Sequence, residues 1–225
     1  MTIGKDEQNM NKRETMNLLN LLNAGETETI RALLEANLKE LNTKDMIGNK
    51  FLIGIKAAKK ELKKAAKTRP VLGYSHTEND IQYMTDSFWA LALSKEYHTD
   101  LIEDHGNNHG TYPCVEQFIP QAANGHAVTV TPDDIANAWQ PGNDKHKYIA
   151  LPYDPSESRV FLNADYCKMM MQIMGDGARW YTYGPHRPVL IESERGRAVI
   201  VPVRFPGDVE KKYNDHIKAQ QAGAW

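Results

Sequence analysis

A run of strong helix formers that ends at a proline constrains the fold of this chain more than any other feature. Residues 56–67, KAAKKELKKAAK, hold six lysines and one glutamate. They predict a helix, because alanine, leucine, lysine and glutamate have high helix propensity. Arg69-Pro70 predicts its end, because proline disfavours helical geometry in the residue before it. The apolar run FLIGI at 51–55 is expected to form a buried strand before the helix.

Three short strands are expected after this helix. Residues 71–74, 81–84 and 89–93 are apolar runs suited to strands, and residues 78–80 supply a turn between the first two. The polar, turn-rich segment 98–112 predicts a loop. The first half of the chain therefore predicts a β-α-β-β-β unit.

The second half of the chain repeats this order. Thr131 followed by Pro132 predicts the start of a short helix. Residues 164–174, closed by Gly175, predict a longer helix. Strands are expected at 128–130, 148–151, 160–162, 180–183, 188–192 and 197–205. The fold class is therefore predicted to be α+β, with two β-α-β-β-β units that form a weak internal repeat.

Residues 12–42 predict an N-terminal pair of helices. Leucine and isoleucine recur there at three- and four-residue spacing, with a break at Ala24-Gly25 and a restart near Thr27. A helical hairpin packed on the body is one interpretation. A helical arm that binds a partner is the other.

Composition favours a globular protein of the cytoplasm. Apolar residues make up 41% of the chain, and no stretch approaches the ~18 to 20 apolar residues that span a bilayer. The opening segment, MTIGKDEQNMNKRE, lacks the apolar core of a secretory signal. Cys114 and Cys167 are expected to be free thiols. The net charge of -2 gives no global sign of a nucleic-acid binder, so such a role requires a local concentration of charge.

Five strings of residues carry a resemblance to a known family. They are KTRPVLGYSHTENDIQYMTDSFWALALSK at 67–95, GTYPCVEQFIPQ at 110–121, VTVTPDDIANAW at 128–139, VFLNADYCKMMMQIM at 160–174, and RPVLIES with AVIVPVRF within 187–205. In this order they resemble segments of the bacterial DNA polymerase III β sliding clamp family. The resemblance covers the chain from about residue 50 to residue 205.

The resemblance implies a DNA-clamp-like fold. A complete clamp protomer has three domains, each built of two β-α-β-β-β units, so this chain holds enough units for about one clamp domain. The expected division is a helical N-terminal extension at 1–48, a clamp-like domain at 49–205 and a C-terminal tail at 206–225. Within the domain, the first unit is expected at 49–97, the loop and linker at 98–121, and the second unit at 122–205.

The resemblance also implies a groove that binds short extended peptides. Its apolar and aromatic walls would desolvate the anchor side chains of a peptide, while Arg and Asn would fix the peptide backbone. Carried over by motif, the groove residues are Arg69, Leu72, Thr85, Ser87, Phe88, Trp89, Leu91, Pro120, Asn163, Tyr166, Val189, Val199, Val201, Pro202, Val203 and Arg204.

Two departures from the family fall in this groove. The family's His-Arg pair reads Phe88-Trp89 here, and Ala90 stands as an additional residue before Leu91. Both changes are expected to make the wall larger and less polar, which would alter the preferred peptide. In the alternative interpretation, Phe88 and Trp89 only fill core space.

The lysine-rich segment is the candidate DNA contact. In the clamp family, helices line the hole of a ring, and their cations meet the phosphate backbone without reading sequence. The candidate residues are Lys56, Lys59, Lys60, Lys63, Lys64 and Lys67. In the alternative interpretation these lysines form a solvated helix face.

No catalytic, cofactor or metal site is expected. The sequence has no glycine-rich phosphate loop, no Gly-x-Ser-x-Gly elbow and no Cys/His nucleophile context. His98, His105 and His109, with Asp100 and Asp104, match no strong metal-ligand spacing. The protein is therefore predicted not to be an enzyme.

The predicted function is that of a sliding-clamp-like DNA replication accessory protein. Its partners would be DNA polymerase or other proteins with clamp-binding motifs and, for a homo-oligomeric ring of about six copies, duplex DNA. The alternative is a decoy module that forms no ring and sequesters clamp partners or a host clamp. A third interpretation is a degenerate paralogue with a structural role only. No membrane partner is expected.

Overall fold

The chain separates into two compact units. The computed structural model describes residues 12–106, 110–153, 158–205 and 208–221. The two units are Met1–Met46 and Ile47–Trp225. The finer division into two clamp-type units, a linker and a tail stays a prediction.

The first unit is helical, as predicted. It consists of α1 (Lys12–Asn23) and α2, which spans Thr27–Ile47 and continues into the start of the second unit. Gly25 lies between the helices with a φ of 75°, a left-handed conformation that glycine adopts without steric cost. The break expected at Ala24-Gly25 is therefore confirmed.

The second unit is built on a seven-stranded antiparallel sheet. Its strands, in spatial order, are β1 (His76–Glu78), β2 (Ile81–Thr85), β3 (Trp89–Ser94), β9 (Gly196–Ile200), β8 (Val189–Ser193), β7 (Arg179–Thr182) and β4 (His126–Val128). A separate antiparallel pair is formed by β5 (Tyr148–Pro152) and β6 (Arg159–Asn163). A mixed α+β class with a large antiparallel sheet is therefore confirmed.

Two helices of this unit, α4 (Pro132–Ala136) and α5 (Ala164–Met174), begin with side-chain caps that the sequence supplies. The other described helices are α3 (Asn49–Ala65) and α6 (Val209–Gln221), with 3-10 helices η1 (Pro70–Gly73), η2 (Lys95–Tyr97), η3 (Glu116–Phe118) and η4 (Ala122–Asn124). Thr131 and Asp134 form a capping box at the start of α4. The predicted helix 164–174 is found with the same bounds as α5, and the Asn163 side chain caps its start.

An α-β-β-β order occurs twice in the second unit, as α3-β1-β2-β3 and as α5-β7-β8-β9. The two copies meet where β3 pairs antiparallel with β9, with Leu91 opposite Ala198. Across this central pair, β3-β2-β1 corresponds to β9-β8-β7, and β4 adds one strand beyond β7. The internal repeat is therefore present, but α3 has no strand directly before it.

Two predicted strands are wrong. Residues 51–55 form the first turns of α3, because Phe51 and Ile55 belong to a buried helical stripe that continues to Leu62. Residues 71–74 fall largely in η1, since the fixed φ of Pro70 suits the start of a helix. The strand forms later, as β1.

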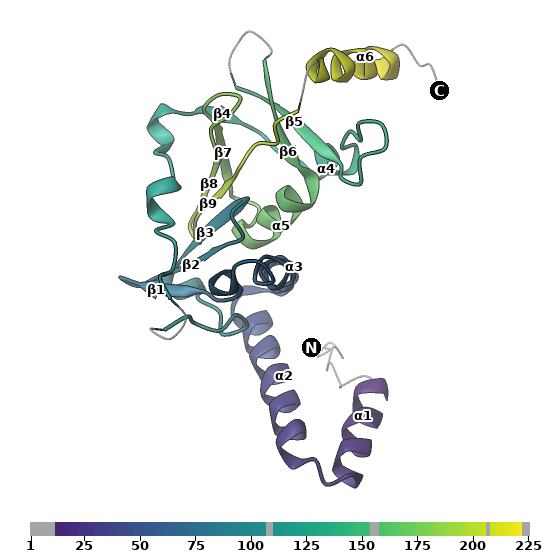
Figure 1. Cartoon of the computed structure of the whole chain (residues 1–225), viewed down its shortest axis with the longest axis vertical. Helices are drawn as coiled ribbons and strands as arrows, with labels where there is room; N and C mark the ends of the chain where they lie inside the picture. The colour runs from purple at the N-terminus through teal and green to yellow at the C-terminus, as the bar shows by residue number, and fades with distance from the viewer. Residues whose placement is uncertain (1–11, 107–109, 154–157, 206–207, 222–225) are drawn as a thin grey trace, which may run out of the picture. The chain divides into compact units, whose positions relative to one another are not determined.

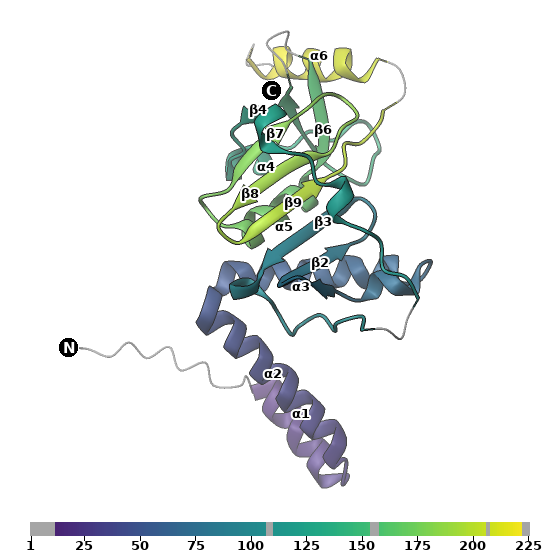
Figure 2. The same cartoon turned by 90° about the vertical axis from the view of Figure 1, so that its left-hand side faces the viewer.

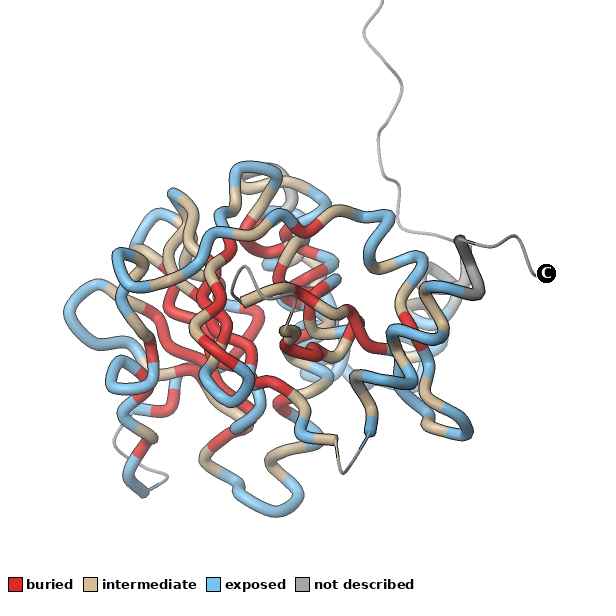
Figure 3. Tube along the Cα trace, turned by 90° about the horizontal axis from the view of Figure 1, so that it is seen from above, coloured by how far each residue is buried: buried red, intermediate tan, exposed pale blue. Residues whose placement is uncertain are grey.

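The core lies on both faces of the large sheet. Along β3, Leu91 and Leu93 belong to a cluster that includes α3 and α5, whereas Ala90 and Ala92 belong to a second cluster on the opposite face. Figure 1 shows α3 and α5 on one side of the sheet and the segment 112–124 on the other. We call this second side the outer face; Figure 2 looks onto it. The buried residues gather in these layers (Figure 3).

Gly54 lies at a tight contact between α3 and α5. A Cβ atom at this position would lie 2.6 Å from Ile173 Cγ1 and 3.1 Å from the Ile173 backbone nitrogen. Real Cβ atoms essentially never lie within 3.0 Å of another atom, so any residue other than glycine here would force the Ile173 side chain or the helix backbone to shift.

The C-terminal helix α6 packs on the β5–β6 pair through aromatic side chains. The Tyr213 ring centre lies 5.6 Å from that of Trp139 and 5.5 Å from that of Phe161. The Arg159 guanidinium lies over the same tyrosine ring at 5.6 Å. The tail predicted at 206–225 thus contains a helix that docks on the body.

Two further expectations concern cysteines and membranes. Cys114 is exposed and Cys167 is buried, and both are free thiols as predicted. In the part of the chain that the structure describes, no helix combines the length and the apolar character needed to cross a bilayer.

Candidate functional site

A pocket of about 280 Å³ opens on the outer face of the sheet. Six residues predicted for the peptide groove line it: Arg69, Thr85, Ser87, Trp89, Val199 and Val201. Five residues that were not predicted complete the lining: Ala90, Pro113, Val115, Phe118 and Pro188. The lining therefore joins segments that lie far apart in the sequence.

Strand pairing forms the floor of this pocket. Thr85 on β2 lies opposite Ala90 on β3, and Ala90 lies opposite Val199 on β9. Leu190 on β8 lies opposite Val199 and continues the row as a fully buried residue. Because directly paired residues share one face of a sheet, Thr85, Ala90 and Val199 stand side by side beneath the pocket.

Asp86 holds the turn between β2 and β3, beside the floor. Its Oδ1 accepts hydrogen bonds from the backbone N–H of Phe88 at 2.7 Å and of Trp89 at 3.0 Å. Thr85 Oγ1 accepts from the Ser87 N–H at 3.1 Å and donates to the Trp89 carbonyl at 2.7 Å. Ser87 has a φ of 83°, in the left-handed region that non-glycine residues seldom adopt. Local hydrogen bonds thus fix the shape of this side of the pocket.

The carboxyl group of Asp86 is buried, and this changes its acidity. Burial raises the pKa of Asp86, against the lowering effect of hydrogen bonds from Phe88, Trp89 and the Tyr166 hydroxyl. Burial also raises the pKa of Tyr166, with the negative charge of Asp86 as the second cause. Tyr166 therefore keeps its proton, and its hydrogen bond to Asp86 connects α5 to the turn.

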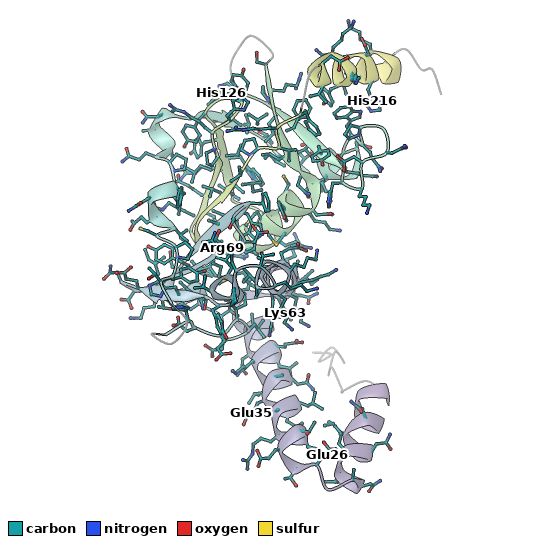
Figure 4. The ribbon with its side chains drawn as sticks, in the orientation of Figure 1. Glu26, Glu35, Lys63, Arg69, His126 and His216 are labelled. Atoms are coloured by element: carbon teal, nitrogen blue, oxygen red, sulfur yellow. The ribbon has the colours of Figure 1, made fainter. Side chains whose placement is uncertain are left out.

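Arg69 carries the single charge among the residues that line the pocket. Its guanidinium donates from one terminal nitrogen to Ser87 Oγ at 3.3 Å, and the residue is exposed. Figure 4 labels Arg69. Within the described residues, Arg69 forms no ion pair with a carboxylate. A planar guanidinium in this position suits a carboxylate supplied by a ligand.

The segment 112–119 forms the wall above the floor. The Tyr112 hydroxyl donates to the carbonyls of Tyr74 at 3.2 Å and Tyr83 at 3.4 Å, and Val115 and Ile119 are buried against the outer face. These contacts hold η3, whose Phe118 is 64% exposed at the pocket.

From the linker, the sequence predicted only Pro120, which lies just after this wall, and it missed Pro113, Val115 and Phe118. Their apolar character within an otherwise polar linker was the sequence feature that could have indicated these residues.

The other predicted groove residues do not line the pocket. Leu91 and Val189 are fully buried in the cluster that packs on α3 and α5, and Leu72 is also buried. Asn163 caps α5, and its Oδ1 accepts from the N–H groups of the first turn. Pocket contacts are likewise missing for Phe88, Pro120, Tyr166, Pro202, Val203 and Arg204.

The structure also reassigns one position in the β3 strand. Ala90, expected to be an additional residue in the strand, occupies the floor of the pocket, and Leu91 lies on the helix side. Trp89 both lines the pocket and fills core space at 1% exposure, whereas Phe88 is 61% exposed. Trp89 therefore fits both interpretations of the pair, whereas Phe88 neither fills core space nor lines the pocket.

The six predicted DNA-contact lysines lie together on the surface of α3 and its end. Lys56, Lys59, Lys60, Lys63, Lys64 and Lys67 line one shallow depression. Figure 4 labels Lys63 among them. Lys64 pairs with Glu61 at 2.7 Å. The opposite face of α3 is buried, so one helix presents a basic stripe to solvent.

The histidine-rich loop does not form a metal centre in the part that is described. His105 is buried among the rings of Tyr74, His76 and Tyr112. No three His, Cys, Asp or Glu side chains in the described ranges are placed to hold a metal ion. His109 lies outside the described residues.

Comparisons with known proteins leave the chain without a match: no family model, no curated protein and no solved structure matches it. The clamp resemblance therefore rests on the five strings of residues, and the candidate site rests on the geometry of the pocket.

Proposed function

We propose that this protein is a sliding-clamp-like binding protein that holds an extended peptide of a polymerase-type partner in the outer-face pocket. One observation carries the proposal. Six residues assigned to a peptide groove from sequence strings between 69 and 201 line a single pocket. This overlap between the residues assigned by resemblance and the residues that line the pocket supports the proposal.

The physical character of the pocket suits peptide side chains. Its volume of about 280 Å³ is near the lower limit of the ~300 to 1,000 Å³ typical of small-molecule sites. Its floor is apolar apart from Thr85, and Arg69 is the only charged residue among those that line it. A short apolar anchor with a nearby carboxylate matches this combination, because the anchor would be desolvated while Arg69 pairs with the acid.

Peptide binding is tested by fluorescence anisotropy with a labelled Gln-Leu-x-Leu-Phe-type peptide. We expect Val201→Glu to weaken binding at least about tenfold, because it places a charge in an apolar site. Ile53→Glu is the matched control, since Ile53 is also exposed, at 46%, but lies on α3.

Equal affinity of both variants would contradict the proposed site. Absence of wild-type binding would favour a degenerate, structural protein. In that case, replacement of Tyr166 and Pro202 should also change nothing.

The proposed fold is one clamp-type domain, and the proposed second ligand is duplex DNA. The twofold α-β-β-β order and the basic stripe on α3 support this, because phosphate contacts need only charge in roughly the right place. The sheet also ends in two short edge strands, β1 and β4, through which copies could join into a ring.

DNA contact is tested by the salt dependence of binding to duplex DNA. Lys63→Gln should reduce the slope of log affinity against log salt by about 1, because one counterion fewer is released. Lys211→Gln on α6 is the control and should leave the slope unchanged. An unaltered slope for Lys63→Gln would show that the basic stripe does not contact DNA.

A decoy that forms no ring is the second candidate function. It is favoured by the limited basic surface: α5, which packs beside α3, exposes Lys168 together with Asp165. Light scattering after size exclusion separates the two functions. An assembly near six copies that stays on closed circular DNA would contradict the decoy, and a monomer that binds peptide but not DNA would contradict the ring.

A further inference from the structure

The first unit leaves its apolar side chains uncovered. Among the side chains that are described in this unit, only Thr43 is buried, so α1 and α2 form no core of their own. Soluble proteins often expose single leucines, whereas a group of them on one short pair of helices indicates a surface that a partner covers. The exposed leucines are Leu22, Leu33, Leu34, Leu38 and Leu41.

Three of these leucines share one side of α2. Leu34, Leu38 and Leu41 follow one another at four- and three-residue spacing, which places them above one another along the helix axis. Leucines at this spacing form the seam along which one helix packs on another. Leu38 is nevertheless 57% exposed. The side of α2 that is suited to a helical partner is therefore open.

α1 adds leucines to the same unit. Leu18 and Leu22 stand four residues apart on α1, and Leu22 is 62% exposed. The chain reverses direction at Gly25, where the N–H of Glu26 donates to the carbonyl of Leu21 at 3.0 Å (Figure 1). The two helices thus form a hairpin in which both members carry uncovered leucines.

The charge of the hairpin argues for a partner of the same kind. Residues 12–47 hold five lysines and arginines and six acidic residues, with the two signs interspersed. Arg31 lies 3.7 Å from Glu28 on the same helix. Surfaces that bind nucleic acid or an anionic membrane carry an excess of cations, which this unit lacks. A second copy brings the same leucines and the same balance of charge.

The surface is also large enough for a contact between two copies. α1 and α2 contain 12 and 21 residues. At about 1.5 Å of length per residue and about 10 Å of width, one side of the hairpin covers about 500 Å². Two copies face to face would bury about 1,000 Å² in total, which reaches the size of a small specific interface.

We infer that the α1–α2 hairpin of one copy packs on the hairpin of a second copy, and that the leucines of both copies form the core of a four-helix bundle. The contact is isologous, because the same side of the hairpin serves both copies. It uses neither the outer-face pocket nor the sheet edges. It therefore goes beyond the proposed function and is compatible with both candidate functions.

The mass of the full chain in solution tests this contact. Light scattering after size exclusion should give twice the 25.5 kDa of one chain. The measurement is made at about 100 µM, well above the ~1 to 10 µM dissociation constant expected of an interface of this size.

Leu38→Lys places a charge on the leucine surface. It should raise the dissociation constant at least about tenfold and lower the mass, because the contact would bury an unpaired charge from each copy. Ala36→Lys is the matched control and should leave the mass unchanged. Ala36 is exposed on the same helix, but residues two apart do not share a side of a helix.

Leu22→Lys tests the surface from α1 and should lower the mass as Leu38→Lys does. Circular dichroism establishes that the variants keep their helices. If Leu38→Lys loses helix, the mass of the Leu22→Lys protein decides the question.

Three outcomes would overturn the inference. A wild-type protein that is monomeric at about 100 µM would mean that the chain's own segments or another protein cover the leucines. An assembly whose mass both leucine variants leave unchanged would place the contact elsewhere. So would a mass that Ala36→Lys lowers as much as Leu38→Lys. Peptide affinity per chain should be the same for the wild type and Leu38→Lys, so the proposed function is tested separately.

Discussion

Asp86 combines two roles at the edge of the pocket. It is 7% exposed, and it organises the turn by accepting two backbone hydrogen bonds and one from Tyr166. Its carboxyl group is at the same time poorly solvated, so burial raises its pKa above the usual 3.8. The turn is therefore stable for geometric reasons, and it carries an electrostatic cost once the carboxyl group ionises.

A pH-dependent stability follows from this residue. The folded state binds the Asp86 proton more tightly than the unfolded state, so the associated stabilisation is complete below pH 3.8 and declines as pH rises through the raised pKa. Asp86→Asn keeps an oxygen for the Phe88 and Trp89 N–H groups but does not titrate. The free energy of unfolding of the wild type minus that of the variant should therefore fall with rising pH.

Urea denaturation of both proteins from about pH 3 to pH 7 measures this difference. A difference that stays constant, or rises with pH, would show that Asp86 is not destabilised by ionisation.

The pair of helices α3 and α5 forms the element that supports the sheet from behind the pocket. Gly54 on α3 lies against Ile173 on α5, with no room for a Cβ atom at residue 54. The lysines of α3 lie on the side of the helix opposite to this contact. One face of α3 therefore packs against the body and the other carries the positive charge. A substitution at the contact should therefore alter stability without altering charge.

Gly54→Ala tests this contact. The added methyl group would overlap Ile173, at a cost of about 1 to 3 kcal/mol for overpacking. The gain in helix propensity offsets up to about 1 kcal/mol of this, so a net loss of stability is expected. Gly177→Ala is the control, because a Cβ atom at residue 177 would meet no atom within 4 Å and its φ is not left-handed. A Gly54→Ala protein as stable as the wild type would mean that the helices adjust without cost.

At the scale of the whole molecule, the two units differ in how much core they contain. Among the residues of the first unit whose side chains are described, Thr43 alone is buried, and five leucines are exposed. The second unit holds both hydrophobic clusters and the pocket. The stability of the site therefore belongs to the second unit.

Removal of residues 1–46 should leave the second unit folded. The melting temperature of the fragment 47–225 should lie within about 3 °C of the main transition of the full chain, because less than about 1 kcal/mol of its core stability is lost. Peptide affinity should be unchanged as well. Differential scanning calorimetry and peptide titration check both statements, and a fragment that fails to fold would place essential packing in the first unit.

The sequence by itself determined the elements whose limits are local. The bounds of α5 follow from Asn163 and Gly175, the turn between α1 and α2 from Gly25, and the start of α4 from Thr131. Caps, glycines and prolines act on their own neighbours, so a single segment contains the information.

Only the tertiary structure decided which side chains meet at the site. Residues 51–55, predicted as a strand, belong to a helix, because they form part of the buried stripe of α3 that extends to Leu62. The tertiary structure also placed Ala90 on the pocket floor and Leu91 in the core, where sequence reasoning had chosen Leu91. Neighbouring residues of a strand point to opposite faces of the sheet. An assignment that is shifted by one residue therefore selects a core residue in place of a groove residue. That choice depends on strand pairing across the sheet, which no single segment of the chain contains.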